Sequence, residues 1–145
     1  MRIQRIDHVH VEVSDRDEAV EWFGAVLDLA PARDLAIWAE DPMGPRVLAT
    51  PDGRPVLSLF ARACQPGSRD TTIAFRVSAA DFMTFLSRVD TLHVQHSDGR
   101  RLTRADVVDH GLAWSIYFMD PWGNRFEITS YDYQALSLDL TPLPD

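Results

Sequence analysis

The strongest constraint on the fold of this 145-residue chain is an internal repeat of one strand–helix pattern. In residues 7–13 three valines alternate with polar side chains, and apolar residues then recur at helical spacing over residues 19–27. Residues 72–77 alternate in the same way, and a second helical stripe follows over residues 82–89. The repeat predicts two equivalent modules, each beginning with a strand and a helix.

Residues at matching boundaries support the repeat. Ser14 and Ser78 each follow an alternating run, and an aspartate stands three positions after each of them, which predicts a helix N-cap in both halves. Three short strand-like runs, separated by turn residues, follow each helix. These runs are Leu35–Ala39, Arg46–Thr50 and Val56–Ala61 in the first half, and Leu92–His96, Ala113–Met119 and Arg125–Tyr131 in the second.

The last two runs of each half are separated by similar turns, PDG at residues 51–53 and PWG at residues 121–123. The sequence therefore predicts an α+β fold made of two βαβββ modules within one domain. We expect the first module over residues 1–64 and the second over residues 70–134, with Gln65–Ser68 as the linker.

Composition excludes several classes of function. The formal net charge of −8 disfavours a nucleic-acid partner, because such a surface repels phosphates. The single cysteine, Cys64, excludes an internal disulfide and a site with several thiolate ligands, and we expect it to be an unreactive loop residue. No apolar run is long enough to span a bilayer, and the N-terminus does not resemble a signal peptide, so we expect a cytoplasmic protein without a membrane partner.

Two segments resemble a known superfamily. Residues 6–11 (IDHVHV) are similar to the first strand, and residues 120–128 (DPWGNRFEI) to the closing hairpin, usually DPxGNxxE, of vicinal-oxygen-chelate proteins. This superfamily includes glyoxalases, bleomycin resistance proteins and extradiol dioxygenases, and the resemblance covers nearly the whole chain. It implies two curled mixed sheets around a metal-binding cleft, a homodimer, and a small-molecule substrate with adjacent oxygens.

The resemblance also implies up to four metal ligands, two from each module. The first-strand positions are His8 and Thr72, and the last-strand positions are Leu57 and Glu127. His8 and Glu127 are the expected ligands of a divalent Fe, Mn, Zn or Ni ion, because imidazole nitrogen and carboxylate oxygen suit these metals. Thr72 departs from the three-ligand members, which carry a histidine there, so His10 and His110 are further candidate donors.

Strand alternation places Glu127 opposite the apolar face formed by Phe126 and Ile128. Arg76 is expected to face the cleft, where it could neutralise Glu127 instead of a metal, or could pair with Glu12. Both a metal site and a metal-free polar cleft therefore remain open. The side chains expected to line the cleft are His10, Glu12, Leu57, Thr72, Arg76 and Ser115.

His110 and Tyr117 are the candidate catalytic residues. A histidine, then Ser-x-Tyr, then a glutamate ten residues after the tyrosine resembles the active-site run of extradiol ring-cleaving dioxygenases. There the histidine and tyrosine hydrogen-bond to the substrate or to oxygen, which suits an imidazole that titrates near neutrality and a phenol that can donate to an oxyanion. The alternative is a packing role, with the tyrosine at a cleft wall and the histidine at a strand start.

The leading hypothesis is a small metal-dependent enzyme, with ring-cleaving dioxygenase-like chemistry first and glyoxalase-like isomerisation second. The rival is a metal-free protein that sequesters a ligand, as bleomycin resistance proteins do, and Leu57 and Thr72 favour it. Residues 100–104 (RRLTR) are expected to form a solvated loop that could also guide an anionic substrate. Outside the predicted site, His93 and His96 are expected to be solvated, and Trp38 and Trp122 are candidates for lining a ligand pocket.

Overall fold

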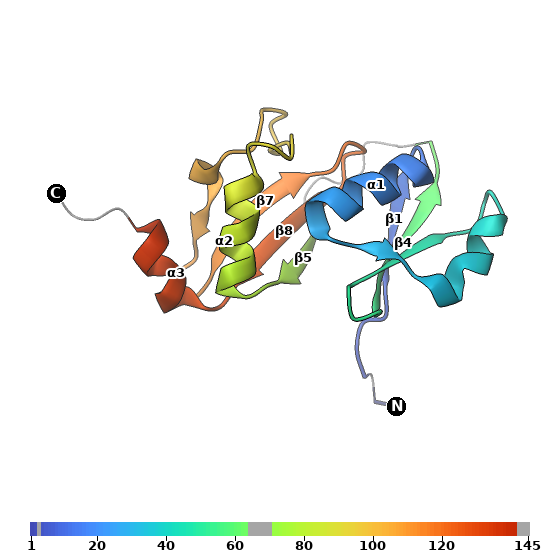
Figure 1. Ribbon diagram of the computed structural model, residues 1–145, viewed down its shortest axis with the longest axis horizontal. Coiled ribbons are helices and arrows are strands. Elements are labelled where there is room, and N and C mark those ends of the chain that lie inside the picture. Colours follow the sequence, from blue (N-terminus) through green and yellow to red (C-terminus); the bar gives the residue numbers. More distant parts are fainter. Residues whose placement is uncertain (3, 64–70, 142–145) are drawn as a thin grey trace. The chain divides into compact units, whose positions relative to one another are not determined.

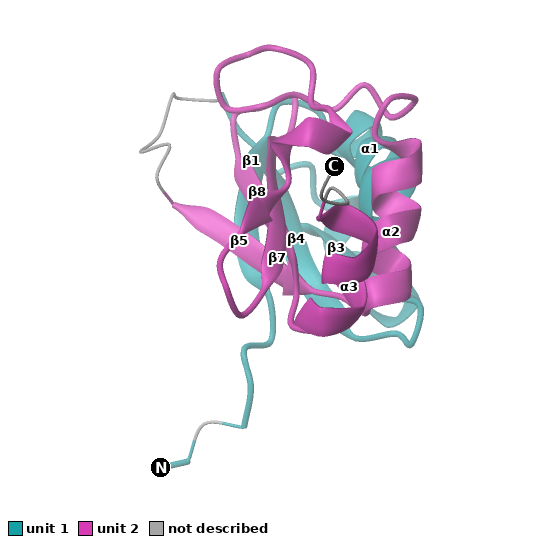
Figure 2. Ribbon diagram, turned by 90° about the vertical axis from the view of Figure 1, so that its left-hand side faces the viewer, with its two compact units in different colours: residues 1–66 teal, residues 67–145 magenta. Residues whose placement is uncertain are grey.

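A computed structural model of the chain describes residues 1–2, 4–63 and 71–141. The chain divides into two compact units, unit 1 over Met1–Pro66 and unit 2 over Gly67–Asp145 (Figure 2). Cys64 and the expected linker Gln65–Ser68 lie outside the described residues. No helix in the described parts of the chain is both long and apolar enough to cross a membrane.

Unit 1 contains a four-stranded sheet with the strand order β1-β4-β3-β2. The first strand runs parallel to β4, and the other neighbours are antiparallel. Helix α1 follows β1 in the chain, and a 3-10 helix, η1, follows β2 (Figure 1). The elements are β1 (Val9–Val13), α1 (Arg16–Leu27), β2 (Ala30–Pro31), η1 (Arg33–Glu40), β3 (Arg46–Ala49) and β4 (Pro55–Ala61).

Unit 2 has the same arrangement, with the strand order β5-β8-β7-β6 and a parallel pair formed by β5 and β8. Helix α2 lies on one face of this sheet, and a further helix, α3, follows the last strand (Figure 1). The elements are β5 (Thr72–Arg76), α2 (Ala79–Arg88), η2 (Arg104–Asp106), β6 (Val108–Asp109), β7 (Trp114–Met119), β8 (Arg125–Ser130) and α3 (Tyr133–Leu140).

The predicted α+β fold of two βαβββ units is therefore confirmed. In both sheets the first strand of the unit pairs in parallel with the last, and the two middle strands complete the sheet in antiparallel order. A strand and its parallel neighbour need a long crossover, which each helix and the strands after it provide.

The helix caps agree with the prediction in one unit and differ by one residue in the other. Ser78 accepts a hydrogen bond from the Asp81 amide at 3.2 Å and caps α2, as predicted. In unit 1 the cap is Asp15 rather than Ser14, and its Oδ1 accepts from the amides of Asp17 and Glu18 at 2.8 and 3.0 Å. A carboxylate at this position satisfies unpaired amides and also complements the helix dipole.

One face of the unit 2 sheet forms its core against α2. Phe82 and Phe85 of α2 are buried, and the ring of Phe85 lies 5.6 Å from that of Phe118 on β7. Phe118 in turn lies 5.8 Å from Phe126 on β8, and both are fully buried. Because neighbouring residues of a strand point to opposite faces, this apolar layer leaves the other face of the sheet to the intervening polar residues.

Two predicted strands are wrong. Residues Leu35–Ala39 lie within the 3-10 helix η1, and the edge strand of that sheet is the two-residue β2. Arg16 donates to the carbonyl of Ala39 at the end of this helix and to that of Asp41 just after it, a long-range contact that no local sequence pattern indicates. Residues Leu92–His96 form turns with an isolated bridge at Gln95, and the edge strand is Val108–Asp109.

Candidate functional site

The face of the unit 2 sheet opposite α2 carries a row of polar side chains, which we call the polar face. Glu127 lies on β8, the middle one of three neighbouring strands. In the register it pairs with Ala74 on β5 and with Tyr117 on β7. Residues that share a register position point to the same side of the sheet. The polar face consists of Thr72 and Arg76 on β5, Ser115 and Tyr117 on β7, and Arg125, Glu127 and Thr129 on β8.

Two buried hydroxyls fix the carboxylate of Glu127. Ser115 Oγ donates to Glu127 Oε1 at 2.7 Å and lies 3.0 Å from Thr129 Oγ1. Ser115 is fully buried and Thr129 is 9% exposed, whereas Glu127 itself is half-buried. A carboxylate offers about four acceptor positions. The bond from Ser115 therefore orients Glu127 and leaves it able to bind another group.

Tyr117 and His110 form a second polar pair next to Glu127. Tyr117 Oη lies 3.1 Å from His110 Nε2, and the two rings meet edge to face. Burial raises the pKa of the Tyr117 phenol, the charge of Glu127 and a hydrogen bond with Glu127 add to this, and the charge of Arg125 opposes it. The phenol is therefore protonated near neutral pH and can donate a hydrogen bond.

A short turn holds His110 near the polar face. His110 lies directly after β6, and its amide donates to the Ala113 carbonyl at 2.9 Å, which closes the turn into β7. Gly111 occupies this turn with a φ of 77°, a conformation that glycine adopts without strain. The predicted pair of His110 and Tyr117 is thus brought together in space.

The two β5 side chains on the polar face do not neutralise Glu127. Thr72 lies beside Arg125 in the register, whereas the small Ala74 lies beside Glu127. Arg76 packs over the ring of Tyr131, with its guanidinium carbon 5.1 Å from the ring centre. Within the described residues no ion pair joins Arg76 to Glu127.

In unit 1 His8 precedes β1 and is hydrogen-bonded to its neighbour. Asp7 Oδ2 lies 2.8 Å from His8 Nδ1, and the His8 side chain is 44% exposed. A carboxylate on one ring nitrogen favours the tautomer that leaves the lone pair of Nε2 available, the arrangement in which histidine commonly binds metals. The donor chemistry of His8 therefore fits a metal ion.

His10 and Glu12 lie on the face of the unit 1 sheet that is opposite Val11 and Val13. The His10 ring stacks on Phe60 at 4.2 Å, and His10 Nε2 lies 3.9 Å from Glu12 Oε1. Both side chains are about half exposed, whereas Val11 and Val13 are buried. The stacking covers one face of the imidazole, and about half of the His10 side chain stays exposed.

The expected correspondence between Leu57 and Glu127 is off by one residue. His10 lies beside Ser58 in the register, just as Ala74 lies beside Glu127, so Ser58 is the structural counterpart of Glu127. Leu57 is fully buried on the apolar face and does not line a polar face. The reason is a β-bulge in the first hairpin, which adds one residue to β4 and thereby reverses which side chains face the core.

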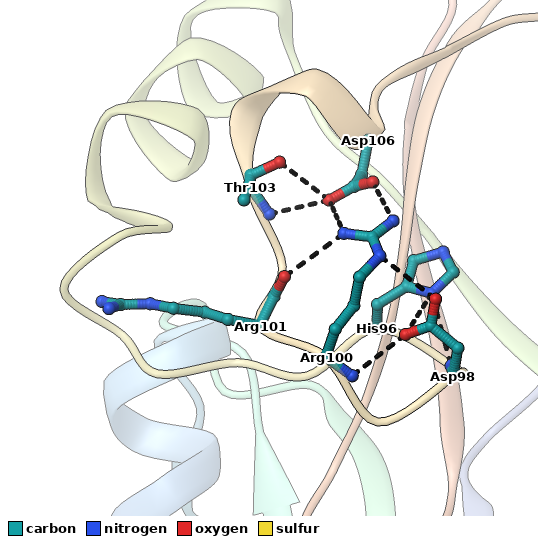
Figure 3. A network of polar contacts seen from close by, with 6 residues as sticks. All are labelled: His96, Asp98, Arg100, Arg101, Thr103 and Asp106. Atoms are coloured by element: carbon teal, nitrogen blue, oxygen red, sulfur yellow. Dashed lines mark hydrogen bonds and ion pairs between the residues drawn. The ribbon is translucent and has the colours of Figure 1, made fainter.

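The loop from residue 95 to 106 is more ordered than its basic sequence indicates. Arg100 donates two hydrogen bonds to the Asp106 carboxylate and two to that of Asp98, from its amide and from Nε, and Asp98 also contacts His96 at 3.1 Å (Figure 3). Thr103 closes a capping box with Asp106. The expected solvated loop is confirmed, because Arg100, Arg101 and Arg104 are exposed, and the guanidinium of Arg100 in addition holds the loop together.

The remaining candidates are scattered. His93 has a φ of 51° in a turn, Trp38 is 49% exposed on η1, and Trp122 lies in the closing turn between β7 and β8. Within residues 1–2, 4–63 and 71–141, no group of three or more His, Cys, Asp or Glu side chains is arranged to hold a metal ion.

The sequence did not indicate two contributors to these sites, Asp7 and Arg125, whereas strand alternation placed Thr129 on the same face as Glu127. Arg125 precedes Glu127 by two positions, so the same alternation could have placed it on the polar face. The contact of Asp7 with His8 depends on a side-chain orientation that no sequence pattern reveals.

Solved structures of low sequence identity share this fold. The fosfomycin resistance protein FosX from Listeria monocytogenes, solved with Mn(II), is 13% identical with a TM-score of 0.65, covering 95% of this chain and 98% of FosX. Oxidase ChaP-H2 is 24% identical with a TM-score of 0.63, covering 92% and 97% of the two chains. A glyoxylase/bleomycin resistance protein/dioxygenase domain from Frankia sp. EAN1pec is 15% identical with a TM-score of 0.66, covering 90% and 93%.

No curated protein matches the chain significantly. A family model, in contrast, matches residues 5–128, which include both segments that carried the resemblance. The chain belongs to the Glyoxalase/Bleomycin resistance protein/Dioxygenase superfamily.

Proposed function

We propose that the protein is a small metal-dependent enzyme that acts on a compound with vicinal oxygens, and that His8 and Glu127 are protein ligands of its divalent ion. The observation that carries the proposal is the polar face, where buried Ser115 orients Glu127 next to the pair of Tyr117 and His110. The metal is expected to be Fe, Mn, Zn or Ni, since a nitrogen and a carboxylate oxygen suit these ions.

The energetics of the polar face favour a functional role over a structural one. Burying hydroxyl groups costs free energy unless they are hydrogen-bonded, and apolar residues would stabilise this strand more simply. Here the buried Ser115 and Thr129 bond to each other, and Ser115 also bonds to Glu127. Their arrangement fixes one carboxylate, which is the role that residues behind a metal ligand or a catalytic base perform.

A divalent ion bound at this site would act as a Lewis acid that polarises the substrate oxygens. The chain's own residues would then position the substrate and move protons. Tyr117 would donate its O–H to a substrate oxygen that becomes negative, and His110 would accept or return a proton at Nε2. Ring-cleaving dioxygenase-like chemistry is the first candidate reaction and glyoxalase-like isomerisation is the second.

The relatives support metal use. FosX from Listeria monocytogenes was solved with Mn(II), and ChaP-H2 is described as an oxidase. Their fold, which this chain shares, therefore accommodates a metalloprotein. We extend that property to this chain because His8 and Glu127 have suitable donor atoms.

The decisive experiment measures bound metal. The full chain is purified without a tag or a chelator, and metal content is determined for wild type, His8→Ala and Glu127→Gln, with His93→Ala as a control histidine in a turn. We expect about one equivalent of metal per chain in wild type and in the control, and loss in both ligand variants. A wild-type protein that is empty and that also fails to bind added Fe, Mn, Zn or Ni would overturn the proposal.

A metal-free binding protein is the second candidate, and a specific observation favours it. The counterpart of Glu127 in unit 1 is Ser58, and Thr72 occupies the position where three-ligand relatives carry a histidine. Such a protein would sequester a small ligand without converting it. An empty wild type that binds no added metal would support this alternative.

A further inference from the structure

Among the charged residues of the polar face, Arg125 is unusual because a nitrogen of its side chain is buried without a hydrogen-bond partner. It precedes Glu127 by two positions on β8 and packs its guanidinium over the Tyr117 ring, with 4.9 Å between the guanidinium carbon and the ring centre. Its Nε is buried without a hydrogen-bond partner, and among the described residues only Arg46 Nε shares this property. Arg46, however, forms an ion pair with Asp17 at 2.7 Å.

Arg125 has no such counter-ion within the described residues. The chain carries 22 acidic and only 14 basic residues, so carboxylates are abundant, and the equally half-buried Arg46 has one. Holding a guanidinium partly out of water without an anion costs free energy, and contact with an aromatic ring offsets only part of that cost. An anion beside Arg125 would offset this cost.

The neighbours of Arg125 are hydrogen-bond donors. The Tyr117 ring, whose phenol O–H can donate a hydrogen bond, lies under the guanidinium. The terminal nitrogens of Arg125, unlike Nε, are not buried without a partner, so they can reach a ligand. Arg76 adds a second exposed cation on the same face. Glu127 lies about 7 Å further along the strand, far enough to bind a different part of one molecule.

We propose that Arg125 binds an anionic oxygen group of the substrate, a carboxylate or a phosphate-like group, on the polar face next to Tyr117. The inference rests on the proposed function for the identity of the ligand as a substrate, and it adds that the vicinal oxygens and the anionic group belong to one molecule. A guanidinium is suited to this role because its planar fork of N–H donors matches an anionic oxygen group.

The test uses the metal-free, ¹⁵N-labelled full chain and the Nε–H signal of Arg125, which is identified by its loss in Arg125→Gln. Sodium acetate and inorganic phosphate are titrated at constant ionic strength, and neutral acetamide is the control for acetate. We expect a saturable shift of the Arg125 signal, and of the Tyr117 and Glu127 amides, with at least one anion and not with acetamide. Whether acetate or phosphate binds more tightly distinguishes a carboxylate from a phosphate-like group.

The variants test the residue itself. Arg125→Gln should weaken anion binding about tenfold or more, as judged from the amide signals, and Arg125→Lys should weaken it less. Arg104→Gln removes the same charge from an exposed residue and should leave binding unchanged. If Arg125→Gln does not fold, Arg125→Lys provides the comparison. Absence of a saturable shift, or equal binding by wild type and the Arg125 variants, would overturn the inference.

This outcome is independent of the metal measurement. Saturable anion binding in a protein that takes up no metal would retain Arg125 as an anion-binding residue and reject the metal enzyme. Stoichiometric metal without anion binding would retain the metal enzyme and reject Arg125 as an anion-binding residue.

Discussion

Ser115 illustrates how one buried hydroxyl can determine the properties of a site. It is fully buried, it donates to Glu127 Oε1 at 2.7 Å, and it lies 3.0 Å from the Thr129 hydroxyl. Strand alternation predicted its face correctly from the sequence. Its partners depend on the register between β7 and β8, because the bond to Glu127 runs diagonally across the two strands.

Substitution of Ser115 by Ala should affect both stability and metal binding. Loss of the hydroxyl leaves buried polar atoms of its partners without a hydrogen bond, which should lower the free energy of unfolding by about 1 to 3 kcal/mol. It should also weaken metal binding about 10- to 100-fold, the usual effect of removing a group that orients a metal ligand. Urea unfolding and metal titration measure the two effects.

Ser87→Ala is the matched control, since Ser87 is exposed on α2 and bonds only to a helix carbonyl. Ser87→Ala should change neither the free energy of unfolding nor the metal affinity appreciably. Unchanged metal affinity in Ser115→Ala would show that Ser115 has only a structural role.

Among the connecting elements, the loop over residues 95–106 is held by ion pairs in addition to the buried side chain of Leu102. The hydrogen bonds from Arg100 hold the pKa of Asp106 well below its usual range, and hydrogen bonds from Thr103 contribute (Figure 3). The Asp106 side chain is only 12% exposed, whereas Arg100 is about half exposed. The geometry is that of a single arginine closing a loop around a sheltered carboxylate.

Asp106→Asn should destabilise the protein in a pH-dependent way. We expect a loss of about 1 to 2 kcal/mol near neutral pH, at the lower end for charge-assisted hydrogen bonds because solvent screens the half-exposed Arg100. Because the pKa of Asp106 is lowered by folding, its stabilisation is present above the unfolded-state value of about 3.9 and is lost as the pH falls through the lower folded-state value.

The difference in the free energy of unfolding between wild type and Asp106→Asn should therefore become smaller below about pH 4. Denaturant unfolding at several pH values measures it. Asp90→Asn, at an exposed aspartate, is the control. A difference that stays constant down to the acid transition would contradict the assigned role of the carboxylate.

Helix α3 is an element that the repeat did not predict. Its residue Ser137 accepts a hydrogen bond from Trp114 Nε1 at 3.0 Å, and its Tyr133 ring stacks on Trp114 at 5.8 Å. Leu136 is fully buried, whereas Leu138 on the same helix is 85% exposed. The helix therefore covers the start of β7 through one side only.

Leu136→Ala and Leu138→Ala form a matched pair that tests this packing. Removing the buried side chain should lower the free energy of unfolding by about 2 to 4 kcal/mol, because it leaves a cavity. The exposed position should change it by about 0.5 kcal/mol or less. Equal effects in thermal or urea unfolding would contradict the described docking of α3.

For the molecule as a whole, the two units share one topology but carry different chemistry. Unit 1 contributes His8, backed by Asp7, and unit 2 contributes Glu127, backed by Ser115. The two proposed metal ligands thus belong to different units. Homodimer formation, which the family resemblance led us to expect, remains a prediction that sedimentation of the full chain can measure.

Metal binding should be visible as a change in global stability. A ligand that binds only the folded state stabilises it by about 2.7 kcal/mol at 100 times its dissociation constant, so Mn(II) or Zn(II) should raise the Tm by several degrees. His8→Ala and Glu127→Gln should each abolish this increase. A rise that persists in either variant would place the ion at another site.

The sequence by itself determined the repeated α+β topology and the orientation of the polar face of unit 2. Alternation, helical spacing and cap residues are local properties of the sequence. They predicted most strands and the helix cap at Ser78, and they placed Glu127 and Tyr117 on the same face of the sheet. The motif at residues 120–128 was sufficient to indicate the superfamily.

The tertiary structure decided the features that depend on distant partners. A one-residue bulge made Ser58, not Leu57, the counterpart of Glu127, because a shift of one residue reverses the faces of a strand. Residues Leu35–Ala39 became a 3-10 helix and Val108–Asp109 an edge strand, since edges depend on long-range hydrogen bonds. That the guanidinium of Arg125 has no counter-ion among the described residues likewise depends on the tertiary structure, because ion pairs join residues far apart in the chain.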